Sequence, residues 1–493
     1  MTVNSDPKRQ LSGVTYKDVE ADYFEKRGLR RFAGIWSLWA LGVGAVISGH
    51  FSGWNLGLAS GGWGGMMIAA AIMAVMFLCL SFCIAEMSAA LPLSGGSYSY
   101  ARVALGPFWG FVSGLCEHIE YVLTPAVICY FIGAYLAAIF GPAVPDIVWW
   151  CGIYAVFLAL NMLGVALTFG ITLVVTLTSL AVLLYFCAIG LPHIDIARWA
   201  LNIGADGSLL PEGHGPFLPF GWMGVLACLP FAVWLYLAIE ELPLAAEETI
   251  DPVRDMPKGI LLALGTLILT GFLIMVVNPA LPGVGAYELA RSGEPVLMGF
   301  RALLHSASAD LLGIVALSGL VASFHAILFA QGRQIFALSR SGYLPRGLSI
   351  TNGERKTPVR AMLAGSGLGL GIMITLRLAL GQEAGPAIGG TLLHMAVFGA
   401  MLSYISRAAA YLVLRRTRPT LPRPYKSPVG RLGAWATIAI SVVTLACQVQ
   451  DPAFLTGTIW VVVWLALGIL YFWMIARHAL VLSPEERAAM ADT

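Results

Sequence analysis

Two glutamates lie one helical turn apart inside a long apolar stretch of this chain. Glu117 and Glu120 would share one face of a helix with Tyr121. Charged groups inside a bilayer are costly, so they are kept where they have a partner or a function. A carboxylate beside an aromatic ring suits an organic ammonium ion, because the ring adds cation–π attraction. The alternative is that each carboxylate pairs with a histidine of another helix, such as His50 or His325.

Other ionisable side chains also fall in apolar stretches: His50, Glu86, His118, Glu240, Glu241, His325 and His394. Glu240 follows Trp234 by six residues, with Tyr236 between them. Its carboxylate could accept a proton or hold a freed backbone amide, and either role would couple ligand binding to helix movement. The alternative is a glutamate that only fixes helix ends.

Three of these residues have simpler interpretations. Glu86 lies near the end of an apolar stretch, which favours a structural or gating role, and His325 is interpreted as packing or gating. His50 follows Ser48 and Gly49. If that segment unwinds, its imidazole reaches a cavity; if not, it is a hydrogen-bonded histidine between helices.

The elements that position these residues include two interrupted helices. Residues 42–53 contain four glycines and two serines in what should be a membrane-buried helix. Breakable backbone at that depth is tolerated where protein or a cavity covers it, and glycine lets a ligand approach the backbone closely. The stretch therefore predicts either a broken helix that lines a ligand site or glycines that allow close helix packing.

Residues 230–241 form the second interruption. They hold Pro230, the aromatic residues Phe231, Trp234 and Tyr236, and two carboxylates. Interrupted segments at corresponding places of two five-span halves indicate a transporter with inverted repeats.

The composition is that of an all-α integral membrane protein. The 493 residues are 58% hydrophobic and 11% charged, and the mean hydropathy is +0.80, whereas soluble domains have about 25% charged residues. A span needs about 20 apolar residues, which predicts twelve transmembrane helices: 33–58, 64–91, 107–139, 147–168, 170–190, 219–247, 258–280, 310–339, 359–380, 387–414, 433–449 and 454–478.

Several function classes are disfavoured by the sequence. The formal net charge is +2 and no basic cluster carries interleaved aromatic residues, which argues against nucleic acid as a partner. The eight cysteines all fall in apolar stretches and are interpreted as buried small hydrophobic residues. No nucleophile–base pair, phosphate loop or metal motif is present, so we expect no enzyme, no metal and no cofactor.

Lysine and arginine placement predicts the orientation. With the N-terminus inside, 25 of the 29 basic residues fall on the cytoplasmic side when residues near helix ends are counted, among them Arg407 near the end of span ten. We therefore expect a multi-pass protein of the inner (plasma) membrane with both termini cytoplasmic. The predicted divisions are a tail (1–31), a first five-helix repeat (32–190), a second (219–414), accessory helices 11–12 (432–478) and a second tail (479–493).

Four stretches together resemble the amino acid–polyamine–organocation superfamily of transporters. They are residues 42–49, 85–98, 231–249 and 332–345. The resemblance covers nearly the whole chain. It implies a LeuT-like core of five plus five helices in inverted repeats, with broken helices 1 and 6, two accessory helices and alternating access around a site at spans one, three, six and eight.

Residues 46–55 and 117–121 resemble the ethanolamine permease branch of this superfamily. The resemblance implies import of a small organic amine such as ethanolamine. The substrate-binding candidates are Ser48, Gly49, His50, Glu117, Glu120, Tyr121, Phe231, Trp234 and Tyr236, and the coupling or gating candidates are Glu86, Glu240 and His325. Trp234 could also close over the ligand as a lid. His50 departs from the small or acidic residue expected at its position.

Two alternatives to amine import remain open. One is an amino-acid permease or exchanger, against which the span-three acids argue. The other is a membrane receptor or sensor, which would need a soluble signalling domain. The coupling ion, a proton or sodium, is also open; residues 170–190 lack the lysine that replaces sodium in some relatives.

Overall fold

The computed structural model describes residues 13–20, 22–92, 95–141, 143–201, 204, 208, 214–351, 355–381, 385–451 and 455–482. Parts of both predicted tails, residues 1–12 and 483–493, lie outside the described residues. The described chain is helical, and its β-structure is limited to two isolated bridges, Tyr16–Leu480 and Ala33–Thr249.

Helical segments lie at all twelve predicted spans. In chain order they are α1 (Ile35–Val46) with α2 (Ser48–Phe51), α3 (Leu58–Ala90), α5 (Pro107–Phe140), α6 (Asp146–Met162), α7 (Val165–Gly190), α8 (Gly221–Val233) with the 3₁₀ segment η6 (Ile239–Glu248), α9 (Pro252–Val277), α12 (Ser306–Arg340), α13 (Val359–Leu380), α14 (Gly385–Thr417), α15 (Gly430–Gln450) and α16 (Leu455–Met474).

Nine helices of the described chain are long and apolar enough to cross a membrane. Three shorter apolar helices, Ile35–Phe51, Asp146–Met162 and Gly221–Val233, lie at predicted spans one, four and six. The all-helical membrane architecture is therefore confirmed, and the crossing of all twelve segments stays a prediction.

Two connections between the predicted spans contain short helices. The link 92–106 holds α4 (Gly96–Leu105), whose residues from Gly96 to Arg102 are buried. The connection 281–309 holds α10 (Gly285–Leu289) and α11 (Pro295–Leu303). Burial against the spans gives these short helices the stabilisation that their length alone would not supply.

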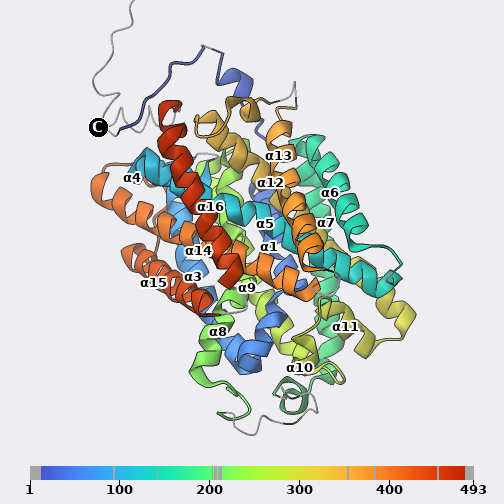
Figure 1. Cartoon of the computed structure of the whole chain (residues 1–493). Helices are drawn as coiled ribbons and strands as arrows, with labels where there is room; N and C mark the ends of the chain where they lie inside the picture. Colours follow the sequence, from blue (N-terminus) through green and yellow to red (C-terminus); the bar gives the residue numbers. More distant parts are fainter. Residues whose placement is uncertain are drawn as a thin grey trace, which may run out of the picture.

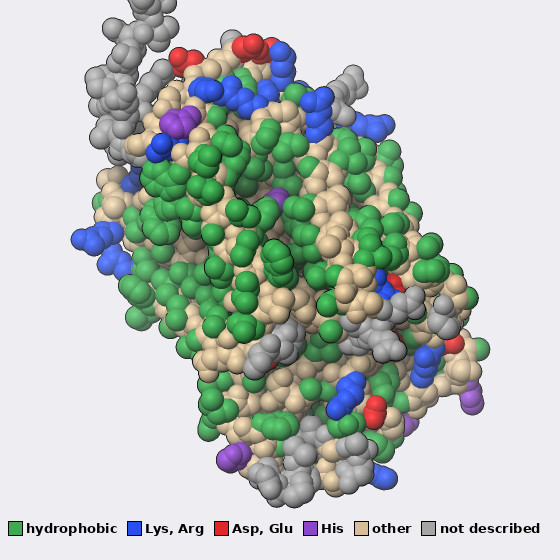
Figure 2. Space-filling model, in the orientation of Figure 1, with side chains coloured by type: hydrophobic (Ala, Val, Ile, Leu, Met, Phe, Trp, Pro, Cys, Tyr) green, Lys and Arg blue, Asp and Glu red, His purple; other side chains and the backbone are tan. Residues whose placement is uncertain are grey.

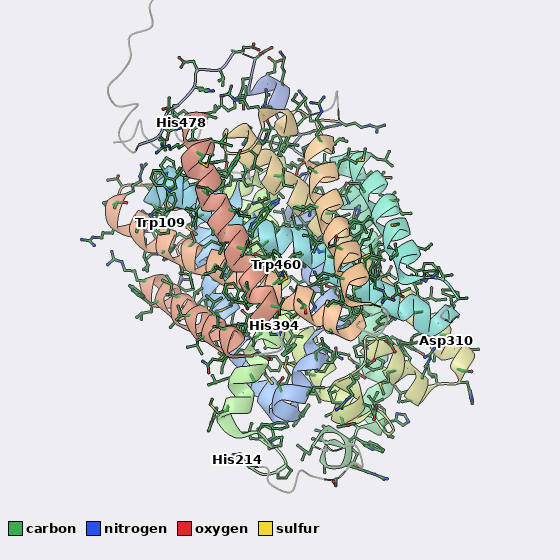
Figure 3. All side chains as sticks on the ribbon, viewed as in Figure 1. Trp109, His214, Asp310, His394, Trp460 and His478 are labelled. Atoms are coloured by element: carbon green, nitrogen blue, oxygen red, sulfur yellow. The ribbon has the colours of Figure 1, made fainter. Side chains whose placement is uncertain are left out.

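The ends of the described chain lie on one side of the molecule. Figure 1 shows the described N-terminal segment and the end of α16 together at one end, with α8, α10 and α11 at the opposite end. On the visible face in Figure 2, hydrophobic side chains cover the middle, and many Lys and Arg side chains gather at the end near the termini. In Figure 3, His478 marks that end and His214 the other. Which side of a membrane this end faces stays a prediction.

Burial separates central helices from peripheral ones. The most apolar stretch of α14 is 78% buried, and those of α5 and α12 are 67% buried, whereas those of α13 and α16 are 22% buried. The central helices therefore hold the polar groups discussed below, and α13 and α16 present apolar side chains to their surroundings.

Candidate functional site

Span one is interrupted at Ile47, between α1 and α2. The backbone N–H of Ser48 leaves the helical ladder and donates to Ser323 Oγ of α12 at 2.9 Å. The Ser323 hydroxyl in turn donates to the carbonyl oxygen of Gly44 at 2.6 Å. The interruption lies within the predicted stretch, and a side chain of span eight satisfies the freed amide.

Span six is interrupted between Val233 and Ile239. Pro230 remains inside α8, so the break begins after the proline rather than at it. Ala238 has a left-handed φ of 86°, and its N–H donates to the two carboxylate oxygens of Glu240 at 3.1 and 3.3 Å. Glu240 thus holds a freed backbone amide, and its role in coupling stays a prediction.

The two interruptions pack backbone against backbone. A Cβ atom at Gly49 would lie 2.2 Å from the carbonyl oxygen of Trp234 and 3.2 Å from the Cα of Leu235. The indole N–H of Trp234 donates to the carbonyl oxygen of Ser52 at 3.1 Å. Gly49 is therefore required by a close helix approach, and Trp234 joins the end of span one to the break in span six.

His50 lies between helices. Its imidazole is fully buried, and its Nδ1 is 3.3 Å from the Thr270 hydroxyl of α9. Gly271 gives it room, since a Cβ there would be 3.2 Å from His50 Nε2. This is the geometry of the simpler interpretation, a hydrogen-bonded histidine between helices.

Glu117 forms a buried ion pair with Arg407 of α14. Its Oε1 also accepts the N–H of Ser97 at 3.2 Å. For Glu117, the alternative of a histidine partner is therefore wrong, because its partner is an arginine. By sequence, Arg407 counts with the basic residues of the cytoplasmic side, but its side chain is 1% exposed, and α14 continues ten residues beyond it to Thr417.

Arg407 joins three spans. Besides Glu117, its guanidinium donates to the carbonyl oxygen of Glu240 at 3.0 Å and to the Tyr121 hydroxyl at 3.3 Å. A single side chain of span ten thus contacts span three and the broken part of span six.

Glu120 lies beside this network, and no Lys or Arg of the described residues forms an ion pair with it. Its Oε1 is 3.5 Å from the Tyr404 hydroxyl of α14. Among the described residues, Glu120 Oε2 and both carboxylate oxygens of Glu241 have no hydrogen-bond donor.

The charge balance of this cluster is uneven. Four carboxyl groups, those of Glu117, Glu120, Glu240 and Glu241, surround one described guanidinium, that of Arg407, and all are at most 1% exposed. Buried like charges cannot all remain ionised without compensation. The cluster can therefore hold further positive charge.

Aromatic rings lie next to the cluster. Tyr236 contacts Phe77 with ring centroids 5.6 Å apart, and Phe77 contacts Tyr404 at 5.5 Å. Phe231 packs instead on His394 at 5.1 Å. Of the predicted binding residues, the structure brings Glu117, Glu120 and Tyr121 together with Glu240, while Phe231 has other contacts.

Glu86 and His325 lie in other networks. Glu86 accepts hydrogen bonds from Arg415 at 2.6 and 2.9 Å, from Tyr411 at 3.0 Å and from the N–H of Ser427 at 2.8 Å. Glu86 thus ties α3 to the end of α14 and to the link that follows. His325 Nδ1 accepts the Asn161 side-chain amide at 2.8 Å, which joins α12 to α6.

A second set of ion pairs joins η6 to α12. Arg333 pairs with Glu248 at 2.8 Å, and both side chains are 1% exposed. Arg340 pairs with Glu247 at 2.5 Å. These pairs close the predicted cytoplasmic half of span six against span eight.

Sequence reasoning missed Arg407 and Ser323. Arg407 lies inside the predicted span 387–414, so an arginine in an apolar stretch was an available signal. Ser323 carried none, because a serine in a membrane helix is common. No three His, Cys, Asp or Glu side chains of the described ranges are placed to hold a metal ion.

Comparison with known proteins gives consistent matches. A family model described as amino acid permease matches residues 34–477. A methylthioribose transporter of Bacillus subtilis is 26% identical over 92% of this chain and 96% of its own length. A branched-chain amino acid permease of the same organism is 25% identical over 94% and 96%. A vacuolar cationic amino acid transporter of Arabidopsis thaliana is 26% identical over 69% and 52%.

Proposed function

The chain belongs to the amino acid permease family, and from that premise we propose that it is a secondary active transporter that imports a small organic amine, ethanolamine in particular, by alternating access. Transporters in this family are not enzymes, and the chain's relatives bear transporter names. The proposal adds the chemical class of the substrate to this family-level function.

One observation carries the choice of an amine: the buried carboxyl surplus around Glu120. Arg407 is paired with Glu117. Among the described residues, no second Lys or Arg side chain pairs with Glu120, Glu240 or Glu241, and oxygens of Glu120 and Glu241 have no donor. An ammonium group placed among them would supply the missing positive charge and donate to the unpartnered oxygens. Tyr404 and Tyr121 would add aromatic surface beside it.

The span-one amides are less suited to a substrate carboxylate in this conformation. The Ser48 N–H is occupied by Ser323, and Gly49 is covered by the backbone of Trp234. An amino acid would need hydrogen-bond donors for its carboxylate. Ethanolamine has a small, uncharged hydroxyl at the corresponding position and does not need them. This difference favours the alkanolamine.

An amino-acid permease is the second candidate. The near full-length match to a permease named for branched-chain amino acids favours it. Neither that name nor methylthioribose, named for another relative, describes an amine, so the substrate is decided by measurement.

The membrane placement completes the proposal. We infer twelve spans in a five-plus-five inverted-repeat core with two accessory helices, in the plasma membrane, with both termini in the cytoplasm. The clustering of Lys and Arg at the end where both termini lie supports this orientation (Figure 2). Transport is driven by a proton gradient, a sodium gradient or exchange.

The direct test is uptake into proteoliposomes of labelled ethanolamine and labelled leucine, with imposed proton or sodium gradients. We expect saturable ethanolamine uptake that leucine does not inhibit and that one of the two gradients accelerates. Saturable leucine uptake without competition by ethanolamine would exclude the amine and favour the second candidate.

Replacing Glu120 by Gln tests the site. The change keeps the shape and removes the charge, so we expect the KM for ethanolamine to rise at least about tenfold, the loss of a charge-assisted hydrogen bond. Glu288→Gln, at an exposed position of α10, is the matched control and should transport normally. A Glu120→Gln protein with unchanged KM would remove Glu120 from the site.

A further inference from the structure

The hydroxyl of Ser323 takes the place of one backbone hydrogen bond of span one. In a regular α-helix the N–H of Ser48 would donate to the carbonyl oxygen of Gly44. Here Ser323 Oγ lies between the two groups, accepting from Ser48 at 2.9 Å and donating to Gly44 at 2.6 Å. The helix is interrupted at the same place, since α1 ends at Val46 and α2 begins at Ser48.

A hydroxyl is suited to this position, because it carries one donor and two acceptor lone pairs. It therefore satisfies both backbone groups at once. An inserted side chain is a known cause of helix interruption, and an unpaired amide at this depth would be costly. Ser323 is fully buried, so no water is needed to complete the arrangement.

The gap lies between two anchored parts of span one. Before it, the Thr176 hydroxyl of α7 donates to the carbonyl oxygen of Ala40 at 3.1 Å, and a Cβ at Gly44 would lie 2.6 Å from Thr176 Oγ1. After it, Gly49 packs on the backbone of Trp234. The two halves thus follow different neighbours, and the segment around Ser48 is where they can bend.

We propose that Ser323 is a positioning residue that works as a removable wedge in span one. While α12 lies against α1, its hydroxyl holds the gap open. When the two helices separate, the Ser48 N–H returns to the Gly44 carbonyl oxygen and α1 and α2 become one continuous helix that ends at Ser52, where the backbone is extended. The Ser48 amide keeps a partner in both states, so the bend can form and disappear without leaving a buried group unpaired. The inference rests on alternating access, and not on which substrate is carried.

Three single variants test the wedge: Ser323→Ala, Ser323→Thr and Ser179→Ala. Alanine removes the inserted hydroxyl, and threonine restores it. Ser179 is the matched control, since its fully buried hydroxyl donates to Thr176 of its own helix at 2.8 Å. For Ser323→Ala we expect a shift of about two- to tenfold in the KM for labelled ethanolamine, with wild-type values for the other two variants.

A second measurement, hydrogen exchange at the Ser48 amide of the full-length protein, distinguishes two roles of Ser323. In one role its hydroxyl can leave and the Ser48 amide bonds to Gly44 instead; in the other the hydroxyl is a permanent partner of this amide. A wedge predicts that this amide stays protected in Ser323→Ala, because it bonds to Gly44 instead. Exchange that is more than about tenfold faster, or an unchanged KM, overturns the proposal. If the wild type carries leucine and not ethanolamine, the amine proposal fails separately and the same variants are compared with leucine.

Discussion

At the scale of single residues, Arg407 organises the centre of the molecule. It neutralises Glu117 and donates to the broken part of span six through the carbonyl of Glu240. Removing one partner of a buried ion pair lowers the stability more than removing both, because the remaining charge is then buried without a countercharge. The pair is therefore a structural element of the candidate site. Glu120 beside it has a carboxylate oxygen that no described donor contacts, so it can accept a hydrogen bond from a cation.

Arg407→Met should lower the free energy of unfolding by about 3–5 kcal/mol, the usual effect of leaving one buried charge unpaired. The double variant Glu117→Gln with Arg407→Met should recover part of that loss. Thermal denaturation of the purified protein in detergent measures both. The two single variants, Arg407→Met and Glu117→Gln, are measured beside the double variant. If the double variant loses as much free energy of unfolding as the two single variants together, the residues act independently.

At the scale of elements, the break in span six depends on one residue in a left-handed conformation. Ala238 has φ 86°, a conformation that costs about 1–2 kcal/mol for a residue with a side chain. Its amide is compensated by the carboxylate of Glu240. The chain accepts this strain where the helix must end and restart, directly beside Gly49 of span one.

Ala238→Val should destabilise the protein by roughly 1–2 kcal/mol, because a β-branched side chain fits the left-handed region poorly. Ala238→Gly, which removes the steric conflict, serves as the comparison and should be neutral within about 1 kcal/mol. The melting temperatures of the two variants are compared, and we expect the lower value for Ala238→Val. Equal melting temperatures for valine and glycine would mean that the left-handed conformation is not required.

At the scale of the whole molecule, contacts between distant parts of the chain hold together the end at which the described N-terminal segment lies. Glu248 pairs with Arg333, and the backbone of Phe32 and Ala33 donates to the carbonyl oxygen of Glu248. The Tyr23 hydroxyl donates to the carbonyl oxygen of Arg340 at 2.8 Å. Burial raises the pKa of the Tyr23 phenol, so it keeps the proton it donates at neutral pH. The N-terminal segment thus ties span six to span eight.

Glu248→Gln should loosen this closure, because Arg333 is then buried without a full countercharge. We expect amide hydrogen exchange in η6 and at the cytoplasmic end of α12 to accelerate by at least about tenfold. Glu288→Gln, at an exposed site in α10, should leave the exchange unchanged. Wild-type protection in Glu248→Gln would show that the ion pair does not hold this side closed.

The sequence by itself determined the membrane class, the positions of the helical segments and the two interruptions. These features follow from local composition: long apolar runs, and glycine- and proline-containing stretches within them. Glu117, Glu120, Tyr121 and Glu240 were also placed together by helical spacing and by the family resemblance. Local patterns carry such information because they depend on neighbours in the chain.

Only the tertiary structure decided which groups compensate one another. The partner of Glu117 is 290 residues away, and Ser323 is 275 residues from the amide it satisfies. Nothing in either local sequence encodes these distances. His50 shows the same limit, since its contact with Thr270 depends on how α9 packs against α2. Long-range packing, in which a buried polar group must find a partner from another span, fixed the electrostatics of the candidate site and the hydrogen bonds at the junction of α1 and α2.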